Sequence, residues 1–273
     1  MIKLVVCDLD GTLLDDHKMV TQYNREVLRA LRSRGVKICY ASGRDEQMMR
    51  VYADCIGGVD FMLSNNGAML RDNHGTVIHQ SFLKPEDVRV ILQYLDEKNM
   101  TYMMYTADTM YHSEDSPRME KKIRDYESLT EKIGFPVHLD ARELKRGSGF
   151  SCSDSAKIVA YEDDEEKAGI YRAYLGQLEH VHYESTGYGL YGAFHRDVSK
   201  KSALLHVMDH MGIGPEEVCV FGDYDNDLSM FECASHRICM ANGSDSLREK
   251  ASDLAPSNNE DGVGRYLAGL FGL

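Results

Sequence analysis

Residues 4–14 read LVVCDLDGTLL and join an unbroken apolar run to two carboxylates and a glycine. A central strand of a parallel sheet is covered on both faces and carries such a run, so residues 4–7 are predicted to form one. Asp8 then stands where the strand ends, at the edge where open α/β sheets bind their ligands. The stretch therefore predicts a parallel α/β fold with its chemistry at the carboxyl ends of the strands.

Asp8 and Asp10 project to the same side of the chain if the backbone stays extended through Leu9, because side chains alternate along a strand. Two carboxylates so close repel each other unless a cation or a shared proton offsets their charge. Mg²⁺ is the cation that we expect, since it prefers hard oxygen ligands and retains water and phosphate in its shell. Asp and Gly are also common turn residues, so this motif alone leaves a plain turn equally open.

The composition is that of an ordinary globular protein. Of the 273 residues, 43% are hydrophobic and 27% are charged, and the length suggests about two domains. The formal net charge of -13 argues against nucleic acid, because binding a phosphate backbone requires clustered Lys and Arg. Seven cysteines without a Cys-x-x-Cys pair are typical of reduced thiols. Without a signal peptide or an apolar run of the roughly 18 residues that span a bilayer, we expect a cytoplasmic protein with no membrane partner.

Strands and helices alternate at the start of the chain. Helices are predicted at residues 21–34 and 45–56, and further strands at residues 36–41 and 61–63. Both further strands end, like the first, in a polar loop that contains glycine. This alternation is typical of βαβ units and predicts a parallel sheet.

The middle of the chain breaks this alternation and predicts an inserted domain. It contains a predicted hairpin at residues 101–112 and an irregular segment at residues 136–149 before the alternation returns. We therefore predict a Rossmann-like α/β core built from residues 1–82 and 189–273. Residues 83–188 are predicted to form a mixed α/β cap inserted into that core.

A second acidic loop, GDYDND at residues 222–227, again ends an apolar strand at residues 218–221. Capping of the next helix by Asp223 and Asp227 would explain this loop alone. A divalent cation shared by Asp8 and Asp223 explains both acidic loops together.

Ser42 and Lys200 each have an ordinary explanation. Ser42 alone would be the N-cap of the helix at residues 45–56, and Lys200 alone would be a solvated residue at a helix start. A phosphoryl group in transfer carries charge on three oxygens and is stabilised mostly by positioning and electrostatics. A hydroxyl and an ammonium are groups that such a reaction needs, so both residues are candidates for the site.

Four motifs, in their order along the chain, resemble those of the haloacid dehalogenase superfamily. They are DLDGT at residues 8–12, ASGR at 41–44, SK at 199–200 and GDYDND at 222–227. The insertion, with NGA at residues 66–68 and MAN at residues 240–242, resembles the Cof-type phosphatases with a large α/β cap of the C2 type. Four ordered motifs are far more specific than any one of them. The resemblance implies a catalytic core with an inserted cap.

The resemblance implies catalytic roles for four residues. Asp8 would be the nucleophile that forms an aspartyl phosphate. Asp10 would be the general acid that protonates the leaving alkoxide and then the base that activates water. Ser42 would hydrogen-bond the phosphoryl oxygens, and Lys200 would neutralise them and orient Asp8. These roles agree with the physics, since a carboxylate attacks an anionic phosphoryl group only where the charge is partly cancelled.

The resemblance also implies a metal site and further phosphate contacts. Mg²⁺, the implied cofactor, would be held by Asp8, the backbone carbonyl of Asp10, and Asp223. Asp227 would act behind these ligands, on waters or on Lys200. The implied phosphate-binding residues are Ser42, Gly43, Lys200 and Asn226.

These patterns predict a magnesium-dependent phosphatase that hydrolyses a small phosphorylated metabolite, such as a sugar phosphate, a nucleotide or a cofactor phosphate. The alternatives are a phosphomutase that uses the same aspartyl phosphate and a non-catalytic protein that binds a phosphorylated metabolite. Asp10 argues against the non-catalytic protein, because binding alone needs no acid. We expect residues between about 100 and 190 to set specificity, while the sequence indicates neither the individual substrate nor the oligomeric state.

Two basic residues and two histidines near these motifs allow more than one interpretation. Lys201 stands where the family often has glycine, and a surface position is favoured because lysine is almost never buried unpaired. Arg44 fits a structural contact and a substrate contact equally well. His206 and His210 have a spacing that can bind zinc, but they lie largely opposite the apolar stripe of their helix, which favours a solvated face.

Overall fold

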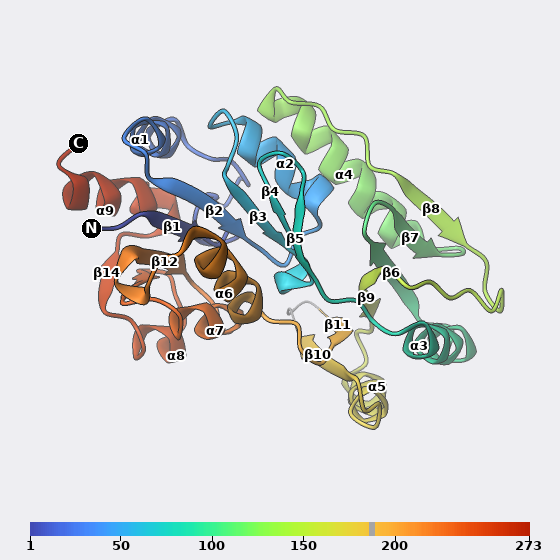
Figure 1. The fold of residues 1–273 in the computed structure, drawn as a ribbon. Coiled ribbons are helices and arrows are strands. Elements are labelled where there is room, and N and C mark those ends of the chain that lie inside the picture. Colours follow the sequence, from blue (N-terminus) through green and yellow to red (C-terminus); the bar gives the residue numbers. More distant parts are fainter. Residues whose placement is uncertain (186–188) are drawn as a thin grey trace. The chain divides into compact units, whose positions relative to one another are not determined.

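The computed structural model describes residues 1–185 and 189–273, which divide into two compact units (Figure 1). The first unit comprises Met1–Gln80 and Ser199–Leu273, and the second comprises Ser81–Val198. The second unit is therefore an insertion in the sequence of the first. Among the described residues, no helix is both long enough and apolar enough to cross a membrane.

An eight-stranded sheet organises the first unit, in the order β14-β13-β12-β1-β2-β3-β4-β5. Its strands are β1 (Leu4–Cys7), β2 (Lys37–Ala41), β3 (Phe61–Ser64), β4 (Met69–Asp72), β5 (Val77–Gln80), β12 (Val218–Gly222), β13 (His236–Met240) and β14 (Asp253–Ala255). Neighbouring strands from β14 to β3 are parallel, and β4 and β5 extend the sheet as an antiparallel edge. This topology confirms the predicted parallel α/β core.

β1 lies inside the sheet and is buried along its whole length. The helices of this unit are α1 (Gln22–Ser33), α2 (Glu46–Asp54), α6 (Lys200–Met211), α7 (Leu228–Phe231), α8 (Asp245–Arg248) and α9 (Gly262–Phe271). Leu4 and Val6 belong to one apolar cluster with Leu204 and Val207 of α6. The alternate residues of β1 face the other side of the sheet, where Figure 1 shows α1 and α9. Helices on both faces explain why the first strand is apolar throughout.

A six-stranded sheet organises the second unit, in the order β10-β11-β9-β6-β7-β8. Its strands are β6 (Thr101–Thr106), β7 (Met110–Ser113), β8 (Ala141–Leu144), β9 (Ser155–Tyr161), β10 (Val181–Ser185) and β11 (Leu190–His195), and its helices are α3 (Pro85–Glu97), α4 (Pro117–Ile133) and α5 (Glu165–Leu175). All pairs are antiparallel except β7 with β8. α3 and α5 share an apolar cluster with β6 and β9, as in Leu95, Tyr171 and Ile158. The second unit is therefore a mixed α/β unit.

Two segments of the second unit differ from the predictions. Residues 136–149 are predicted to be irregular, but they contain β8, an edge strand whose charged residues hide the strand pattern. β11 is not predicted as a strand, and Gly192 weakens its pattern. Because β11 pairs with β9 and β10, the second unit extends to Val198, whereas the predicted cap ends at residue 188.

Candidate active site

The predicted site residues come from loops at one edge of the first unit's sheet. Asp8 follows β1, Ser42 follows β2, and Asp223 follows β12. β1 lies between β2 and β12 and is parallel to both, so the three loops leave the sheet at the same edge. Lys200, the first residue of α6, reaches Asp8 from a distant part of the sequence. The parallel sheet therefore brings remote motifs together.

Asp8, Lys200 and Asp227 form a buried ionic group that we call the inner triad. Lys200 Nζ lies 2.7 Å from Asp8 Oδ1 and 2.6 Å from Asp227 Oδ1, and the Lys200 side chain is only 1% exposed. Burial alone would lower the pKa of Lys200, but the charges of Asp227 and Asp8 outweigh it and raise that pKa. The ammonium is therefore charged at neutral pH and fixes the position of the Asp8 carboxylate.

Asp227 uses both carboxylate oxygens inside this group. Its Oδ2 accepts hydrogen bonds from the backbone N–H groups of Asp223, at 2.9 Å, and Tyr224, at 3.2 Å. Its Oδ1 accepts the bond from Lys200. Asp227 therefore ties the Lys200 ammonium to the backbone of the loop that carries Asp223.

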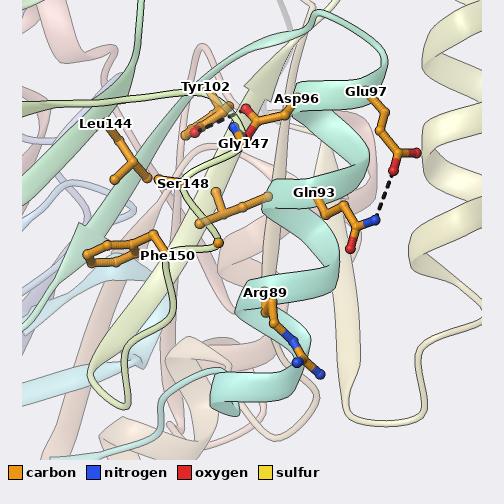
Figure 2. A pocket seen from close by; sticks show the side chains of 11 residues that line it. Arg89, Gln93, Asp96, Glu97, Tyr102, Leu144, Gly147, Ser148 and Phe150 are labelled. Carbon is orange, nitrogen blue, oxygen red and sulfur yellow. Dashed lines mark hydrogen bonds between the residues drawn. The ribbon is translucent and has the colours of Figure 1, made fainter.

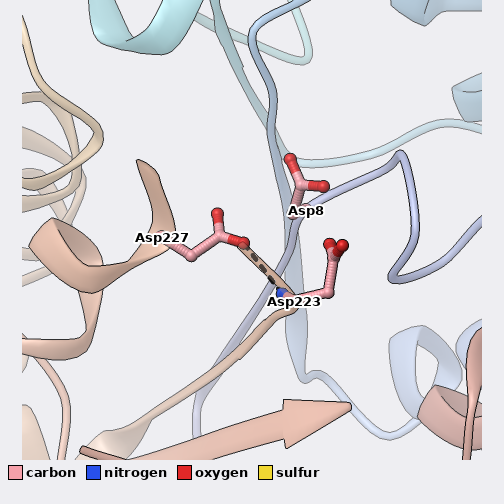
Figure 3. Close-up of side chains that lie close together, drawn as sticks. All are labelled: Asp8, Asp223 and Asp227. Atoms are coloured by element: carbon pink, nitrogen blue, oxygen red, sulfur yellow. Dashed lines mark hydrogen bonds between the residues drawn. The ribbon is translucent and has the colours of Figure 1, made fainter. Parts of the chain in front are cut away.

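Asp8, Asp223 and Asp227 together form an acidic cluster (Figure 3). One carboxylate oxygen from each lies within 4.8 Å of the others. In the described part of the chain, this is the group of three or more Asp, Glu, His or Cys side chains that could hold a metal ion. Lys200 supplies one ammonium against the three carboxylates of the acidic cluster, so a divalent cation would offset the remaining charge. An all-oxygen donor set suits a hard cation.

The surroundings of Asp223 fit a bound cation. Thr12 Oγ1 donates a 2.7 Å hydrogen bond to Asp223 Oδ1. Gly11, at φ +79, brings its backbone so close to this carboxylate that a Cβ there would overlap Asp223 Oδ2. Burial, and then the charge of Asp227, raise the pKa of Asp223 to about 6. Burial also raises the pKa of Asp8, against the opposing charge of Lys200. These carboxyl groups hold protons more tightly than usual, mainly because burial disfavours their charged forms.

Asp10 lies outside the acidic cluster, in an outer cluster with Arg44 and Lys18. Arg44 Nε and Nη2 donate to the two oxygens of Asp10 at 2.6 Å and 2.8 Å. Lys18 Nζ donates to Asp10 Oδ1 at 2.8 Å. Burial would raise the pKa of Asp10, but the hydrogen bonds and charges of Arg44 and Lys18 together lower it. Arg44 therefore makes an intramolecular contact with Asp10.

Ser42 is a buried residue of the loop that follows β2, and the interpretation of a lone serine there as a helix N-cap is wrong. Asp45, and not Ser42, is the N-cap of α2. Ser42 Oγ instead accepts a 3.2 Å hydrogen bond from the backbone N–H of Arg44. Gly43 packs against Asn66, where a Cβ would lie 3.0 Å from Asn66 Oδ1. Ser42 and Gly43, two of the four predicted phosphate-binding residues, therefore lie in a tightly packed loop.

Asn226 and Lys201 lie apart from the buried groups. Asn226 is exposed in the 3₁₀ turn Asp225–Asp227, and among the described residues its side chain forms no hydrogen bond with the acidic cluster. Lys201 pairs with Glu232 at 2.5 Å, with its side chain 43% exposed. The surface interpretation of Lys201 is therefore confirmed.

The two histidines of α6 contact different aromatic rings. His206 stacks on His79, with ring centroids 4.1 Å apart. His210 meets the ring of Phe61 edge to face, with centroids 5.9 Å apart. Their different partners argue against the zinc interpretation.

The second unit has a cavity of about 410 Å³ between α3 and residues 144–150 (Figure 2). Its acidic side chains already have partners, since Asp96 accepts from the N–H of Gly147 at 2.7 Å and Glu97 accepts from Gln93 at 2.9 Å. These contacts stabilise the wall of the cavity. They supply no catalytic group of the kind found at the acidic cluster.

Thr12 and Lys18 contact carboxylates of the site and are given no role by the sequence analysis. Thr12 belongs to the DLDGT motif, so its position close to Asp8 in the sequence could have indicated a place near the acidic loops. Its contact with Asp223 lies there. Lys18 lies in a loop with no motif, and nothing in the sequence separates it from a solvated lysine.

Comparison with known proteins identifies the family. A family model described as haloacid dehalogenase-like hydrolase matches residues 5–267. The chain is 27% identical to a putative phosphatase of Mycoplasma pneumoniae, over 97% of this chain and 96% of the relative. It is 26% identical to the 5-amino-6-(5-phospho-D-ribitylamino)uracil phosphatase YwtE of Bacillus subtilis, over 99% and 98% of the two chains. A solved haloacid dehalogenase-like hydrolase from Bacteroides thetaiotaomicron has the same fold, with a TM-score of 0.86 at 23% identity over 99% of this chain and 100% of that one. The chain therefore belongs to the haloacid dehalogenase-like hydrolases and is a phosphatase of the Cof type.

Proposed function

We propose that the protein is a magnesium-dependent phosphomonoesterase that forms an aspartyl phosphate on Asp8. The observation that carries this proposal is the position of the Asp8 carboxylate, 2.7 Å from Lys200 Nζ and inside the acidic cluster. A carboxylate attacks an anionic phosphoryl group only when nearby positive charge reduces the repulsion. The ammonium of Lys200 and a cation at the cluster would supply that charge.

In the first step, Asp8 attacks the phosphorus and the bond from phosphorus to the ester oxygen breaks. Asp10 donates a proton to the leaving alkoxide. In the second step, Asp10 removes a proton from water, which attacks the aspartyl phosphate and releases inorganic phosphate. Asp8 is regenerated as a carboxylate. The loop at Ser42 and Gly43, with Lys200 and Asn226, would bind the phosphoryl oxygens during both steps.

The residues that would hold Mg²⁺ are Asp8, the backbone carbonyl of Asp10, and Asp223. The ion would neutralise charge on the phosphoryl oxygens. Asp227 would act behind these ligands by orienting Lys200 and the backbone of the Asp223 loop, with which it forms hydrogen bonds.

We propose a small soluble substrate, such as a sugar phosphate, a nucleotide or a cofactor phosphate. Several Bacillus subtilis relatives are named as phosphatases of 5-amino-6-(5-phospho-D-ribitylamino)uracil, so a phosphorylated sugar alcohol with a heterocycle belongs in the first set of candidates. A net charge of -13 supports a small phosphate ester over nucleic acid. All seven cysteines are free thiols, which supports a cytoplasmic location.

The test compares Asp8→Asn with Asp209→Asn in Mg²⁺-dependent hydrolysis of p-nitrophenyl phosphate. Asp209 is an exposed carboxylate of α6 and serves as the matched control. We expect Asp8→Asn to lose at least about 10³-fold in kcat, and Asp209→Asn to keep wild-type activity. Retention of most activity in Asp8→Asn would contradict the proposal. With a sugar phosphate, transfer to a second hydroxyl instead of phosphate release would identify a phosphomutase.

A further inference from the structure

The turn that follows β13 contacts both loops that carry the acidic cluster. Asn242 Nδ2 donates a 2.8 Å hydrogen bond to the carbonyl oxygen of Gly11, in the loop after β1. The N–H of Ser244 donates a 2.8 Å hydrogen bond to the carbonyl oxygen of Asp223, in the loop after β12. We call residues 241–244 the clamp turn, because one short segment holds the backbone of both loops.

The bond from Asn242 to Gly11 does not follow from strand pairing. β13 pairs with β12 and β14, so contact between the clamp turn and the loop after β12 is expected of neighbours. β1 lies beyond β12 in the sheet. The Asn242 side chain therefore reaches past β12, the strand that precedes Asp223, to the loop that follows β1.

The amide of Asn242 is held in one orientation. Its Oδ1 accepts a 3.0 Å hydrogen bond from the N–H of Asn258, which turns Nδ2 toward Gly11. Asn258 is itself buried, and its Nδ2 donates to the carbonyl oxygen of Leu14 at 3.0 Å. The amide donor is thus preorganised by its surroundings, although Asn242 is exposed.

A shift of Gly11 would be transmitted to Asp223. The backbone of Gly11 lies so close to the Asp223 carboxylate that a Cβ would overlap it, and the adjacent Thr12 donates to Asp223 Oδ1. These two residues limit the positions that the carboxylate can occupy. Asn242 therefore acts on Asp223 through Gly11, without touching the acidic cluster itself.

We propose that Asn242 is a positioning residue that sets the spacing between Asp8 and Asp223, and thereby the affinity of the acidic cluster for its divalent cation. This inference rests on the proposed function, because it requires that the cluster bind a cation. Partners that orient metal ligands typically change metal affinity by about 10- to 100-fold. Since Asn242 acts through one intervening residue, we expect an effect at the lower end, about tenfold.

The test is calorimetric titration of Mg²⁺ into the metal-free full chain, with Asn242→Ala and the matched control Asn259→Ala. Asn259 Nδ2 donates to Asp16 Oδ2 at 2.9 Å, so it tethers the same region without a bond to Gly11. We expect the Kd for Mg²⁺ to rise about tenfold in Asn242→Ala and to change less than about twofold in Asn259→Ala. At saturating Mg²⁺, kcat and the KM for p-nitrophenyl phosphate should return close to wild type. A purely structural role would lower the active fraction without moving the Kd.

An unchanged Kd in folded Asn242→Ala would overturn the inference, and so would equal weakening in Asn259→Ala. If Asn242→Ala does not fold, Asn242→Leu keeps the side-chain volume without the hydrogen bonds and is titrated in its place. Failure of both variants to fold would also overturn it, because Asn242 would then maintain the fold. A wild-type chain that binds no divalent cation would overturn the proposed function as well, whereas normal binding in all variants would overturn this inference alone.

Discussion

The inner triad contains Asp8 and the outer cluster contains Asp10, only two residues away in the sequence. The two groups shift the pKa of their carboxyl groups in opposite directions. In the inner triad, one ammonium serves two buried carboxylates, and burial raises the pKa of Asp8. In the outer cluster, two cations serve one partly exposed carboxylate, and they lower the pKa of Asp10 against the effect of burial. The surroundings therefore raise the pKa of Asp8 and lower the pKa of Asp10, although both residues belong to the DLDGT motif.

Each of the two pKa shifts moves its carboxyl group away from the protonation state that the proposed role requires. A nucleophile must be ionised, but Asp8 favours its protonated form more than usual. A general acid must be protonated, but Asp10 favours its ionised form. A cation at the acidic cluster would favour ionised Asp8, and a substrate phosphate that draws Arg44 and Lys18 away would favour protonated Asp10. A cation and a phosphate group would each move one of the two carboxyl groups toward the protonation state that its proposed role requires.

Replacement of Lys200 should have the largest effect on stability and activity, because Lys200 joins the two carboxylates of the inner triad. In Lys200→Met, two buried carboxylates lose their common cation, so we expect a loss of about 3 kcal/mol in the free energy of unfolding at neutral pH. Activity should fall by at least about 10³-fold, because the charge opposite the phosphoryl group is gone. Urea unfolding and phosphate release measure the two effects.

The adjacent lysine provides the control for this change. Lys201 forms an exposed pair with Glu232, so Lys201→Met should leave stability and activity close to wild type. If the two variants have the same stability and activity, the inner triad contributes to neither.

Metal binding should depend on pH through Asp223, whose pKa is raised to about 6. Because the folded state binds this proton more tightly than the unfolded state, the stability that it contributes is present below the unfolded pKa of about 3.9 and is lost as the pH rises to about 6. Mg²⁺ should relieve this cost, so it should raise the Tm more at about pH 7.5 than at about pH 5. Below pH 6, the apparent Kd for Mg²⁺ should rise about tenfold for each further pH unit that the pH is lowered.

Asp223→Asn sharpens this expectation. Without its charge, the metal-free variant should be more stable than wild type at neutral pH, and Mg²⁺ should no longer raise its Tm. Thermal unfolding with and without Mg²⁺ at the two pH values measures both effects. An equal Mg²⁺ response of the wild type at both values would contradict the assignment of Asp223 as a ligand.

The sequence was sufficient to predict that Asp8, Lys200 and Asp223 come together. Asp8 and Asp223 each follow a strand in a βαβ pattern, and a parallel sheet aligns the ends of its strands, whereas Lys200 was placed beside Asp8 by the resemblance of its motif. The acidic character of two such loops added the expectation of a cation. The order and alternation of strands therefore indicated the acidic loops, and the motif resemblance added Lys200.

The outer cluster and the clamp turn lay beyond what a pattern could predict. The contact of Arg44 with Asp10 depends on side-chain reach across two loops, and Lys18 resembles any other surface lysine. The bond from Asn242 to Gly11 crosses a strand, so strand adjacency did not indicate it. Such contacts follow from packing geometry and not from residue type or spacing.

The smallest expected effect separates the two interpretations of Arg44. In a double-mutant cycle of Arg44→Met with Asp10→Asn, we expect a coupling of about 1 kcal/mol in unfolding free energy near pH 7, because Asp10 is partly exposed. The pKa of Asp10 is lowered in the folded state, so this contribution is present above its unfolded value of about 3.9 and declines as the pH falls below it.

In Arg44→Met, the alkaline limb of the kcat/KM profile should move to higher pH, since Asp10 becomes easier to protonate. Lys18→Met should shift it in the same direction but less, because Lys18 makes one contact where Arg44 makes two. An unshifted limb in Arg44→Met, with a raised KM, would mean that Arg44 binds the substrate and does not govern the charge of Asp10.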